Sequence, residues 1–372
     1  MVIVKKVETK KEQREFIDFP IKLYEGNEYF VPYLRSGEKA IFKSSLPYNK
    51  VCEVSFFNAY RDGKIVGRIQ GIIQTEANLK WDQKRARFTR FDAIDDAEVS
   101  KALFDAFTSW AKEKGMNEVV GPLGYSDLER EGLLIEGFEE LQTFEEQYNY
   151  PYYQKLIEDY GFSKDVDWVE CTLRAPKESS DKLLRVSNKM LDKYGLRIVQ
   201  ETSVNRLIKN YAKPLFEMID KTYSRLYGTM PLNDEIVSSL VKDFKMILRP
   251  KDVALIMDKE DKVVGFALLF PSISDVVRKS KGRITLPFLI RFIKTKKHPK
   301  VLDLGLIGIS PEYESKGVIT ALIGLLVEFL EKGGAEHLET NLMLENNTHI
   351  LNLMKHFDHT FNKRRRCFKM DI

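Results

Sequence analysis

The architecture of this chain is set by residues 304–323, which read Leu304-Gly-Leu-Ile-Gly-Ile-Ser-Pro-Glu-Tyr-Glu-Ser-Lys-Gly-Val-Ile-Thr-Ala-Leu-Ile323. They contain a short apolar run, a Pro-Glu turn and a Ser-Lys-Gly elbow, followed by apolar residues at helical spacing as far as Leu330. The pattern predicts a strand that runs into the open N-terminus of a helix. The first N–H groups of a helix lack partners and the helix dipole is positive there, so this position favours an anion such as phosphate.

Gly317 suits the elbow of this junction, because a residue without a Cβ lets a ligand oxygen come close to the backbone. An ordinary helix that is capped by Ser315 and carries a glycine in its first turn would give the same sequence. The residues alone therefore leave an anion site and a plain helix start both open.

Length and composition describe a protein with a sizeable core. With 372 residues, of which 43% are hydrophobic and 31% charged, the chain is long enough for two ordinary domains. It has no apolar run long enough to span a bilayer, and Val2-Ile3-Val4 is followed at once by Lys5 and Lys6, so no signal peptide is expected. We therefore expect a cytoplasmic protein.

The cysteines and histidines give little sign of a disulfide framework or a metal centre. The three cysteines lie far apart without a CxxC pair. A metal site could be built from His356, His359 and Cys367, but no second ligand cluster has zinc-like spacing, and a solvated helix end explains the histidines equally well. We expect no metal, and a net charge of +4 argues against nucleic acid as a partner.

Two hairpins divide the chain into similar halves. Residues 54–73 join two β-rich runs across an Asp-Gly pair, which supplies the positive φ of a tight turn, and residues 253–270 form another hairpin. Lys262-Val-Val-Gly265 echoes Lys64-Ile-Val-Gly67 at a separation of 198 positions, which is also the separation of Asn149 and Asn347. This repeat predicts that both halves bury their cores in the same way.

The two halves differ at one helix end. A helix expected over residues 96–114 begins with Asp95 and Glu98 three positions apart, a capping box that places the protein's own carboxylates on the helix N–H groups. Asp92 and Asp96 add further negative charge. This helix end is therefore expected not to bind a phosphate.

Residues 311–322 carry a resemblance to a known family. Pro311-Glu-Tyr-Glu-Ser-Lys-Gly-Val-Ile-Thr-Ala-Leu322 resembles the acyl-CoA-binding motif of the GCN5-related N-acetyltransferases (GNAT), in which a strand ends in an Arg/Gln-x-x-Gly-x-Gly/Ala loop that holds the pyrophosphate. Gly317 holds the first glycine position, whereas Glu314 replaces Arg or Gln and Ile319 replaces Gly or Ala. Lys316 supplies a positive charge to the loop.

A second segment, residues 345–357, is similar to the family's Asn-x-x-Ala-x-x-Leu-Tyr segment, which flanks the pantetheine arm. The matching residues are Asn347, Ile350 and Leu353. Met354 stands where many members have a tyrosine that protonates the CoA thiolate. The first half keeps a version of this segment at residues 149–162, but it lacks the phosphate loop.

The resemblance covers nearly the whole chain and implies an α/β (mixed α+β) protein of two tandem GNAT-like domains, each a mixed, mostly antiparallel sheet flanked by helices. The N-terminal domain is expected over residues 1–176, without a working CoA phosphate loop. A connecting helix over residues 177–194 then leads to a C-terminal domain over residues 195–372. There, two central parallel strands, at about 302–309 and 336–342, would be splayed to admit pantetheine.

The resemblance also implies that the C-terminal domain binds acetyl-CoA or another acyl-CoA. A backbone N–H from Leu306 to Ile309 would polarise the thioester carbonyl, as a preset hydrogen-bond donor. The residues expected to contact the acyl-CoA are Ile307, Gly308, Ile309, Ser315, Lys316, Gly317, Val318, Ile319, Thr320 and Asn347.

The acceptor would be an amine of a small molecule or a peptide, and this amine must lose a proton. Glu345 or His349 could take the proton directly or through water, although such residues at a helix start also serve as solvated caps. The acceptor is expected in or near the cleft between the domains. Candidate lining residues are Tyr227, Tyr152 and Tyr153, for which aromatic packing is the plainer explanation.

A strongly basic segment precedes the first central strand. Residues 276–300 hold nine Lys or Arg residues and no acid, interleaved with apolar residues. A surface helical insertion with one core-facing side would explain this pattern. The sharper alternative is an acidic partner, such as the CoA 3′-phosphate, an acyl carrier protein or an anionic membrane surface.

Three functions are consistent with these observations. The leading one is an acyl-CoA-dependent N-acyltransferase. Glu314, Ile319 and Met354 also fit a catalytically inactive acyl-CoA-binding or regulatory protein of the same fold. A peptidyl transferase that uses aminoacyl-tRNA is the third, and the modest net charge argues against it.

Overall fold

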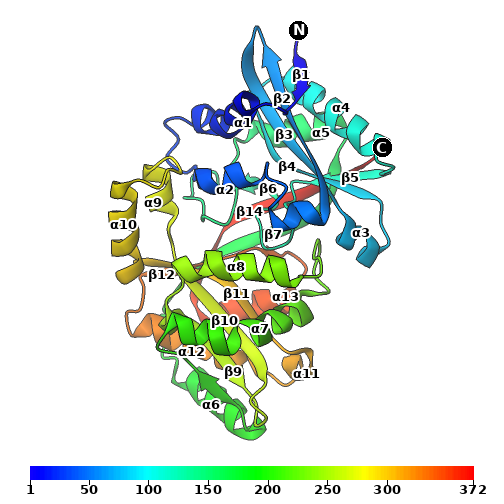
Figure 1. Cartoon of the computed structure of the whole chain (residues 1–372). Helices are drawn as coiled ribbons and strands as arrows, with labels where there is room; N and C mark the ends of the chain where they lie inside the picture. Colours follow the sequence, from blue (N-terminus) through cyan, green and yellow to red (C-terminus); the bar gives the residue numbers. More distant parts are fainter.

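A computed structural model, which describes all 372 residues, shows a single sheet of fourteen strands that runs through both halves of the chain (Figure 1). The strand order is β1-β2-β3-β4-β5-β14-β7-β12-β11-β10-β9-β8, with β6 paired to β14 and β13 paired to β7. The strands are β1 Ile3–Lys6, β2 Cys52–Arg61, β3 Lys64–Gln74, β4 Arg85–Ala93, β5 Glu118–Gly121, β6 Leu133–Glu136, β7 Ser163–Arg174, β8 Arg197–Val199, β9 Val253–Met257, β10 Val263–Pro271, β11 Val301–Ile309, β12 His337–Thr340, β13 Met343–Leu344 and β14 Asp358–Asp371.

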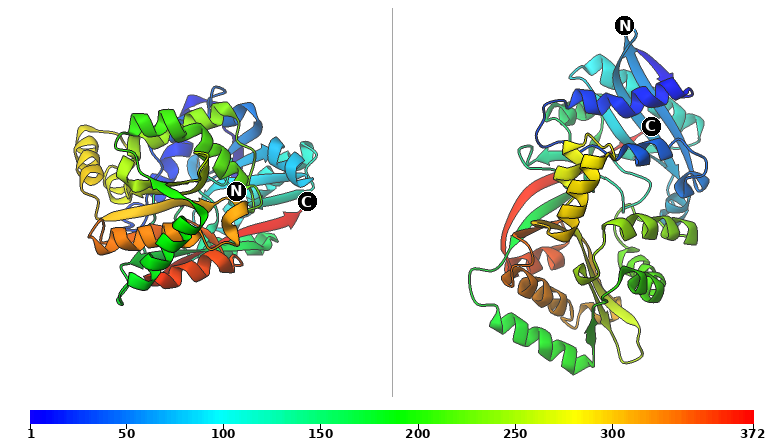
Figure 2. Two further views of the ribbon diagram at one scale, coloured as in Figure 1. Left: turned by 90° about the horizontal axis from the view of Figure 1, so that it is seen from below. Right: turned by 60° about the vertical axis from the view of Figure 1, so that its left-hand side comes forward.

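Helices cover both faces of this sheet (Figure 2). They are α1 Lys10–Leu23, α2 Arg35–Ala40, α3 Thr75–Trp81, α4 Ala97–Glu113, α5 Tyr152–Tyr160, α6 Asp181–Tyr194, α7 Val204–Tyr223, α8 Asp234–Ile247, α9 Ser274–Lys279, α10 Leu286–Lys297, α11 Pro311–Glu314, α12 Ile319–Glu331 and α13 Thr348–Leu353. In the N-terminal half, α4 and α5 pack in one buried cluster and α1 in another; in the C-terminal half, α12 and α13 pack in one and α7 in another. No helix combines the length and the apolar character needed to cross a membrane.

The local elements expected from sequence are largely present. Both hairpins form, and Asp62 and Gly63 have the positive φ angles, 51° and 72°, that the tight turn requires. The pairs β4–β5 and β11–β12 are parallel, whereas the other pairs of the sheet are antiparallel. This confirms the mixed, mostly antiparallel fold and the two central parallel strands of the C-terminal half.

The last strand of each half lies beside a strand of the other half. β14, at the end of the chain, pairs with β5 of the N-terminal half, where Phe368 lies opposite Gly121. β7 pairs with β12 of the C-terminal half, where Leu173 lies opposite Leu338. β7 and β14 also pair with each other over most of their length, so the two halves share one continuous sheet. The periodicity of the sequence gave no indication of this exchange.

Each half has one extra residue in its central strand, but the two residues differ. In β11, Leu304 and Leu306 pair with adjacent residues of β10, so Gly305 is bulged. In β4, the pairing with β3 shifts between Thr89 and Asp92, and Arg90 has a φ of 49°, which is rare for a residue with a side chain. The side chain of Arg90 is buried.

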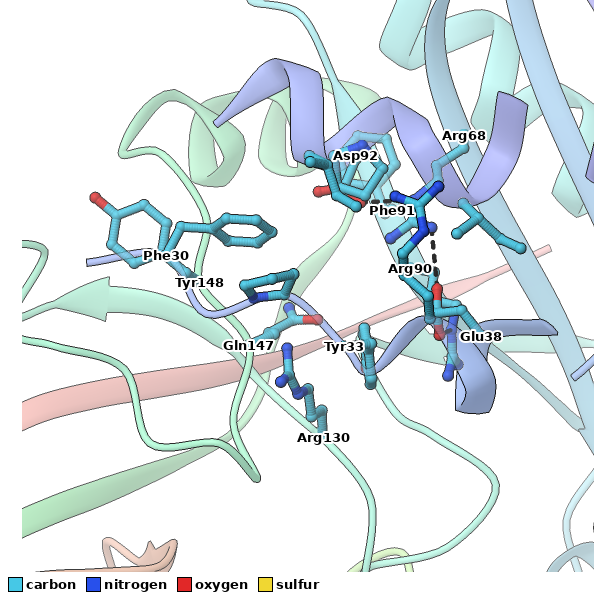
Figure 3. Close-up of a pocket in the computed structure, with 15 residues that line it drawn as sticks. Phe30, Tyr33, Glu38, Arg68, Arg90, Phe91, Asp92, Arg130, Gln147 and Tyr148 are labelled. Carbon is cyan, nitrogen blue, oxygen red and sulfur yellow. Dashed lines mark hydrogen bonds and ion pairs between the residues drawn. The ribbon is translucent and has the colours of Figure 1, made fainter. Parts of the chain in front are cut away.

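The bulge of the N-terminal half is filled by the protein's own ion pairs (Figure 3). Arg90 Nε lies 2.8 Å from Glu38 Oε1, and Arg68 bridges Glu38 and Asp92 at 3.2 and 2.8 Å. The guanidinium of Arg90 also stacks on the ring of Tyr33. The bulge of β4 is therefore filled by charged and aromatic side chains, whereas the bulge of β11 in the C-terminal half holds a glycine.

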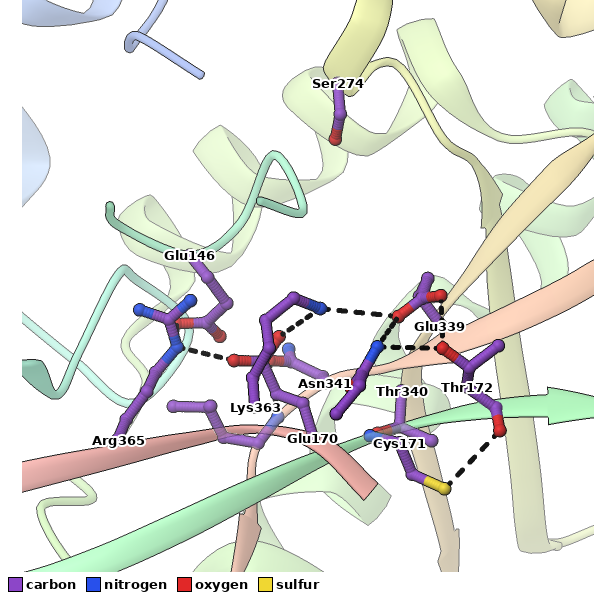
Figure 4. A network of polar contacts seen from close by, with 12 residues as sticks. Glu146, Glu170, Cys171, Thr172, Ser274, Glu339, Thr340, Asn341, Lys363 and Arg365 are labelled. Carbon is purple, nitrogen blue, oxygen red and sulfur yellow. Dashed lines mark hydrogen bonds and ion pairs between the residues drawn. The ribbon is translucent and has the colours of Figure 1, made fainter. Parts of the chain in front are cut away.

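Buried charges hold the exchanged strands together (Figure 4). Arg365 of β14 is fully buried, and its Nε lies 2.6 Å from Glu170 Oε1 on β7. Lys363 Nζ lies 3.3 Å from Glu170 and 3.4 Å from Glu339 of β12. Burial alone would raise the pKa of Glu170, but Arg365 and Lys363 hold it below its ordinary value. Three strands from both halves are thus joined by charges that water does not reach.

Replacing one partner of this network should be costly. We expect Arg365→Met to lower the free energy of unfolding by about 3–5 kcal/mol, because Glu170 loses its closest counter-charge in a buried site. Urea denaturation followed by circular dichroism measures the loss. The double variant Arg365→Met/Glu170→Met should recover part of it, since Glu170 is then no longer a buried charge that lacks its closest partner.

Lys155→Ala is the matched control, because Lys155 pairs with Asp159 on an exposed helix surface. Its cost should be below about 0.5 kcal/mol. An equal loss of stability in Arg365→Met and Lys155→Ala would contradict the structural role of the buried network.

Candidate functional site

The strands β11 and β12 separate at the middle of the C-terminal half. They pair from Val301–His337 to Leu304–Thr340, and the last contact is the Asn341 N–H, which donates to the Leu304 carbonyl at 3.1 Å. The chain then turns away, and β13 pairs with β7 instead. Beyond Leu304 the edge of β11 is therefore free of strand partners on the β12 side, as the splayed strands expected from sequence require.

The start of α12, which follows β11 in the chain, carries free backbone donors. The N–H groups of Gly317, Val318 and Ile319 have no hydrogen-bond partner, and no side chain caps the helix, so the Ser315 cap considered from sequence is not formed. Gly317 has a φ of 70°, and a Cβ placed on it would meet no atom within 4 Å, so the approach is open. The Ile319 side chain is buried in the core and does not obstruct this opening.

Positive side chains lie around this helix start. Lys316 Nζ lies 4.5 Å from the ring centre of Tyr313, and Lys221 of α7 reaches the α11 region, where its Nζ is 2.9 Å from Glu312. Glu314, which replaces the family's Arg or Gln, is exposed and forms no ion pair. Three free amides at a helix start with lysines nearby can hold an anion.

The equivalent helix end of the N-terminal half is occupied. Asp96 caps α4 by accepting from the N–H groups of Glu98 and Val99 at 2.9 and 3.3 Å, and Arg61 pairs with Asp96 and Glu98. The predicted capping box of Asp95 and Glu98 is wrong in its residues, because the cap falls one position later and the Glu98 carboxylate accepts from Val2 and Arg61. A side-chain carboxylate nevertheless covers these donors, as expected.

Tyr223, at the end of α7, reaches into the free edge of β11. Its hydroxyl donates to the Ile307 carbonyl at 3.0 Å and accepts from the Ile307 N–H at 3.3 Å. Burial raises the pKa of this hydroxyl above its ordinary value, so it keeps its proton at neutral pH. α7 can come this close because Gly308 has no side chain; a Cβ there would lie 2.8 Å from Thr222. A proton donor thus lies where the family resemblance places the thioester.

A pocket between the two halves includes the same tyrosine. Its lining combines Asp127 and Leu128 of the N-terminal half with Ile219, Asp220, Tyr223, Ser224, Thr229, Met230 and Leu232 of the C-terminal half. Burial, with a contribution from Asp220, raises the pKa of Asp127 to about 6, against the opposing effect of Arg87 and Lys80. Asp127 can therefore exchange a proton near neutral pH.

The loop after α7 holds the two halves together beside this pocket. Lys80 Nζ donates to Thr229 Oγ1 at 2.9 Å, and Trp81 Nε1 donates to the Thr229 carbonyl at 3.0 Å. Arg87 donates to the Gly228 carbonyl at 2.9 Å. These contacts fix the C-terminal loop against α3 and β4, so the pocket has walls from both halves.

The proposed proton acceptors from sequence lie outside this pocket. Glu345 is held by Lys164 and by Arg364, with 2.8 Å between its Oε2 and the Arg364 Nη1, beside the exchanged strands. His349 is exposed on α13. Asn347 caps α13 by accepting from the Ile350 N–H at 3.3 Å. Their catalytic and binding roles stay predictions, and their surroundings favour structural contacts.

The three tyrosines expected to line the acceptor site are not brought together. Tyr152 donates to the Ala93 carbonyl at 2.8 Å, and the buried Tyr153 accepts from the Tyr24 hydroxyl at 2.8 Å, both near the end of β4. Tyr227 donates to Asp165 at 2.5 Å, in another part of the molecule. Aromatic packing and buried hydrogen bonds account for their positions.

Sequence reasoning missed Asp127 and Tyr223. Asp127 lies in the irregular connection between β5 and β6. Tyr223 is the last residue of α7 and stands four residues before Tyr227. Neither has a spacing that marks it, because each acts through a contact with a distant part of the chain.

Comparison with known proteins agrees with this geometry. Residues 215–358 match the model of the Acetyltransferase (GNAT) family. Over its whole length the chain resembles a tandem GNAT protein from the clavulanic acid biosynthesis pathway, with a TM-score of 0.57, 10% identity, and 100% of this chain and 98% of that chain covered. It also resembles a GCN5-related N-acetyltransferase from Sphaerobacter thermophilus, with a TM-score of 0.53, 10% identity and coverage of 100% and 95%.

Two curated proteins are similar in sequence. Protein YghO of Escherichia coli (strain K12) is 23% identical over 376 residues, which cover 98% of this chain and 94% of that protein. The Bacterial ceramide synthase of Caulobacter vibrioides (strain NA1000 / CB15N) is 24% identical over 293 residues, which cover 76% of this chain and 73% of that protein.

The sheet and the separation of β11 and β12 define a tandem acetyltransferase-like fold, with one half open at the helix start and the other filled. Residues 215–358 match the GNAT family, and the whole chain shares its fold with solved tandem GNAT proteins. The family match lies in the half that has the free helix start.

A carboxylate at the start of α12 should weaken CoA binding. We expect Gly317→Glu to reduce the affinity for CoA at least about tenfold, because a negative charge ~4 Å from a phosphate costs a few kcal/mol at a protein surface. Isothermal titration calorimetry with CoA measures the change.

Gly333→Glu provides a matched control at the other end of the same helix. Gly333 also has a positive φ, 72°, and open space around its Cβ position, so the backbone strain and the added charge are the same. CoA affinity should be unchanged in this variant. Equal weakening in both variants would show that the helix start is not the phosphate site.

Proposed function

We propose that the chain is an acyl-CoA-dependent N-acyltransferase, with acyl-CoA along the free edge of β11 in the C-terminal half and the amino end of the acceptor in the pocket between the halves. The observation that carries this proposal is the position of Tyr223. Its ring lines the interdomain pocket, while its hydroxyl contacts Ile307 on the free edge of β11. One side chain therefore belongs to both sites, as a transfer between them requires.

The residues present fit a CoA thioester. Gly317, Val318 and Ile319 would hold the pyrophosphate with their free N–H groups, and the open edge of β11 would pair with the pantetheine arm. When bound, acyl-CoA supplies an activated acyl group as its thioester. The Ile307 N–H, now on the Tyr223 hydroxyl, is a preset donor for developing negative charge on a carbonyl oxygen.

The pocket is small, at about 10 Å³, so it has room only for the amino end of an acceptor, beside an apolar chain. Asp127 and Asp220 offer two carboxyl groups for an ammonium group, whereas Leu128, Ile219 and Leu232 give apolar walls. The name of the Caulobacter relative points to the same class, because a ceramide is an amide of a long-chain amino alcohol. A long-chain amine is therefore the first acceptor to test, before peptide amines.

Asp127 and Tyr223 would serve two different proton transfers of the reaction. Asp127 in its ionised form would take the proton that the acceptor's nitrogen must lose, and its pKa near 6 leaves it mostly ionised at neutral pH. Tyr223 holds a proton at its Oη beside Ile307, at the opposite end of the reaction path. This assignment supplies a donor in place of the tyrosine that the family segment lacks at Met354, which is buried here.

Free thiol should appear only when acyl-CoA and an amine are both present. The assay combines the purified chain with acetyl-CoA or long-chain acyl-CoA and a panel of long-chain amino alcohols, small amines and peptides, and detects thiol by colour. Amide product, identified by mass spectrometry, should match the thiol released. Tight CoA binding without amine-dependent release would contradict the proposal and favour the regulatory alternative.

The rate should depend on a group that titrates near pH 6. Because the deprotonated form of Asp127 accepts the proton, kcat/KM should rise as pH increases through about 6 and then level off. Asp127→Asn should lower the rate by about 10²-fold or more and remove this acidic limb. Initial rates from pH 5 to pH 8 measure both effects.

The variant Asp220→Asn tests why the pKa of Asp127 is raised. The negative charge of Asp220 helps to raise the pKa of Asp127, so its removal should move the acidic limb to lower pH. If His349→Ala abolished the acidic limb while Asp127→Asn kept it, the assignment of Asp127 as the proton acceptor would be wrong.

A further inference from the structure

Exposed apolar side chains concentrate in one short region of this surface. Of the twelve large hydrophobic residues that are exposed, five lie between residues 284 and 293. They are Ile284, Leu286, Leu289, Ile290 and Ile293. Leu286, Ile290 and Ile293 are 70%, 61% and 63% exposed, so most of each side chain is in contact with water. Scattered exposed leucines are ordinary, but a cluster of this kind marks an interaction surface.

Four of these residues form a stripe along α10. Leu286, Leu289, Ile290 and Ile293 follow the i, i+3, i+4, i+7 spacing that places side chains on one side of a helix. The other side is anchored by Phe288 and Phe292, which are buried with Val31 and Val277. The two phenylalanines account for the folding of α10, whereas nothing in the chain covers the stripe.

Free positive charge surrounds the stripe. Four exposed cations have no acidic partner, namely Arg283, Arg291, Lys294 and Lys297. The remaining cations of residues 278–300 are largely neutralised, for example Lys281 by Glu25 and Lys300 by Glu336. The surface around the stripe therefore attracts anions.

We propose that α10 lies in the interface of an anionic lipid bilayer, with its apolar stripe in the acyl boundary and its lysines and arginines at the headgroups. A helix of 12 residues is about 18 Å long, too short to span the hydrocarbon, but suited to lying in its surface. A second copy of the chain would place the positive charges of two α10 helices next to each other, which is unfavourable. A soluble acidic partner would account for the positive charges but not for the exposed apolar stripe. A bilayer with anionic headgroups satisfies both features at once.

Contacts with both halves of the chain hold α10 in place and so give the contact with the bilayer a defined orientation. α9 and α10 form an insertion between β10 and β11, seen in yellow across the junction of the halves (Figure 2). The Arg35 N–H donates to the Gly282 carbonyl at 2.9 Å, and Lys281 pairs with Glu25 of the N-terminal half. Lys296 donates to the Met246 carbonyl at the end of α8, where the Met246 side chain is also exposed. Contacts to both halves thus fix the helix, so the bilayer would hold the whole molecule in one pose.

Vesicle sedimentation tests this proposal without any assay of activity. The full chain should bind vesicles of phosphatidylcholine with phosphatidylglycerol, and binding should fall as salt increases, because exposed charges are screened. Phosphatidylcholine alone should bind at least about tenfold more weakly, since it offers no net charge. Absence of binding to the anionic vesicles at low salt would overturn the proposal.

Two sets of variants separate the apolar and the charged contributions. Leu289→Ser/Ile290→Ser/Ile293→Ser and Arg291→Glu/Lys294→Glu/Lys297→Glu should each reduce vesicle binding at least about tenfold. Thermal melting should show that both fold, because all six side chains are exposed. Full binding by the serine variant would show simple charge attraction without insertion and would contradict the proposal.

Exposed residues elsewhere supply the matched controls. Leu79→Ser removes an apolar side chain that is 72% exposed on α3, and Lys112→Glu/Lys209→Glu reverses exposed charges on α4 and α7. These variants should bind vesicles like the unaltered chain. If the serine variant instead abolished a dimer seen by sedimentation velocity while vesicle binding was unchanged, the stripe would be a contact between copies and the bilayer assignment would be wrong.

Discussion

The exchange of β7 and β14 between the two halves is the constraint on which the rest of the structure depends. Paired strands satisfy their backbone hydrogen bonds in each other, so neither half can complete its sheet alone. The charges of Arg365, Glu170 and Lys363 are buried at this seam, and they are stable there only while both strands are in place. The halves are therefore parts of one sheet rather than independent units on a linker.

This shared sheet creates the chemistry of the interdomain pocket. The irregular segment that carries Asp127 and the helix that carries Tyr223 belong to different halves, and the strand exchange and the Thr229 contacts bring them to one place. Withdrawal from water is what raises the pKa of the Asp127 carboxyl. A surface aspartate on a separate domain would not have this property.

The two halves show how one fold can be filled or left open. The central strand of each has an extra residue, which is Gly305 in β11, while β4 places the buried Arg90 in its bulge. Asp96 covers the helix donors of the N-terminal half, and the corresponding donors at Gly317 are free. Packing and charge thus fill this position in the N-terminal half and leave it open in the C-terminal half.

The sequence by itself determined the local elements and the difference between the two helix starts. Asp62-Gly63 specifies a hairpin turn, the apolar spacing after Gly317 specifies α12, and acidic residues near position 96 specify a capped helix, because turn geometry, helical periodicity and capping act over a few residues. Only the tertiary structure decided the strand exchange and the meeting of Asp127 with Tyr223. Those contacts join residues that are far apart in the chain, and the burial that raises the pKa of Asp127 exists only once both halves have packed together.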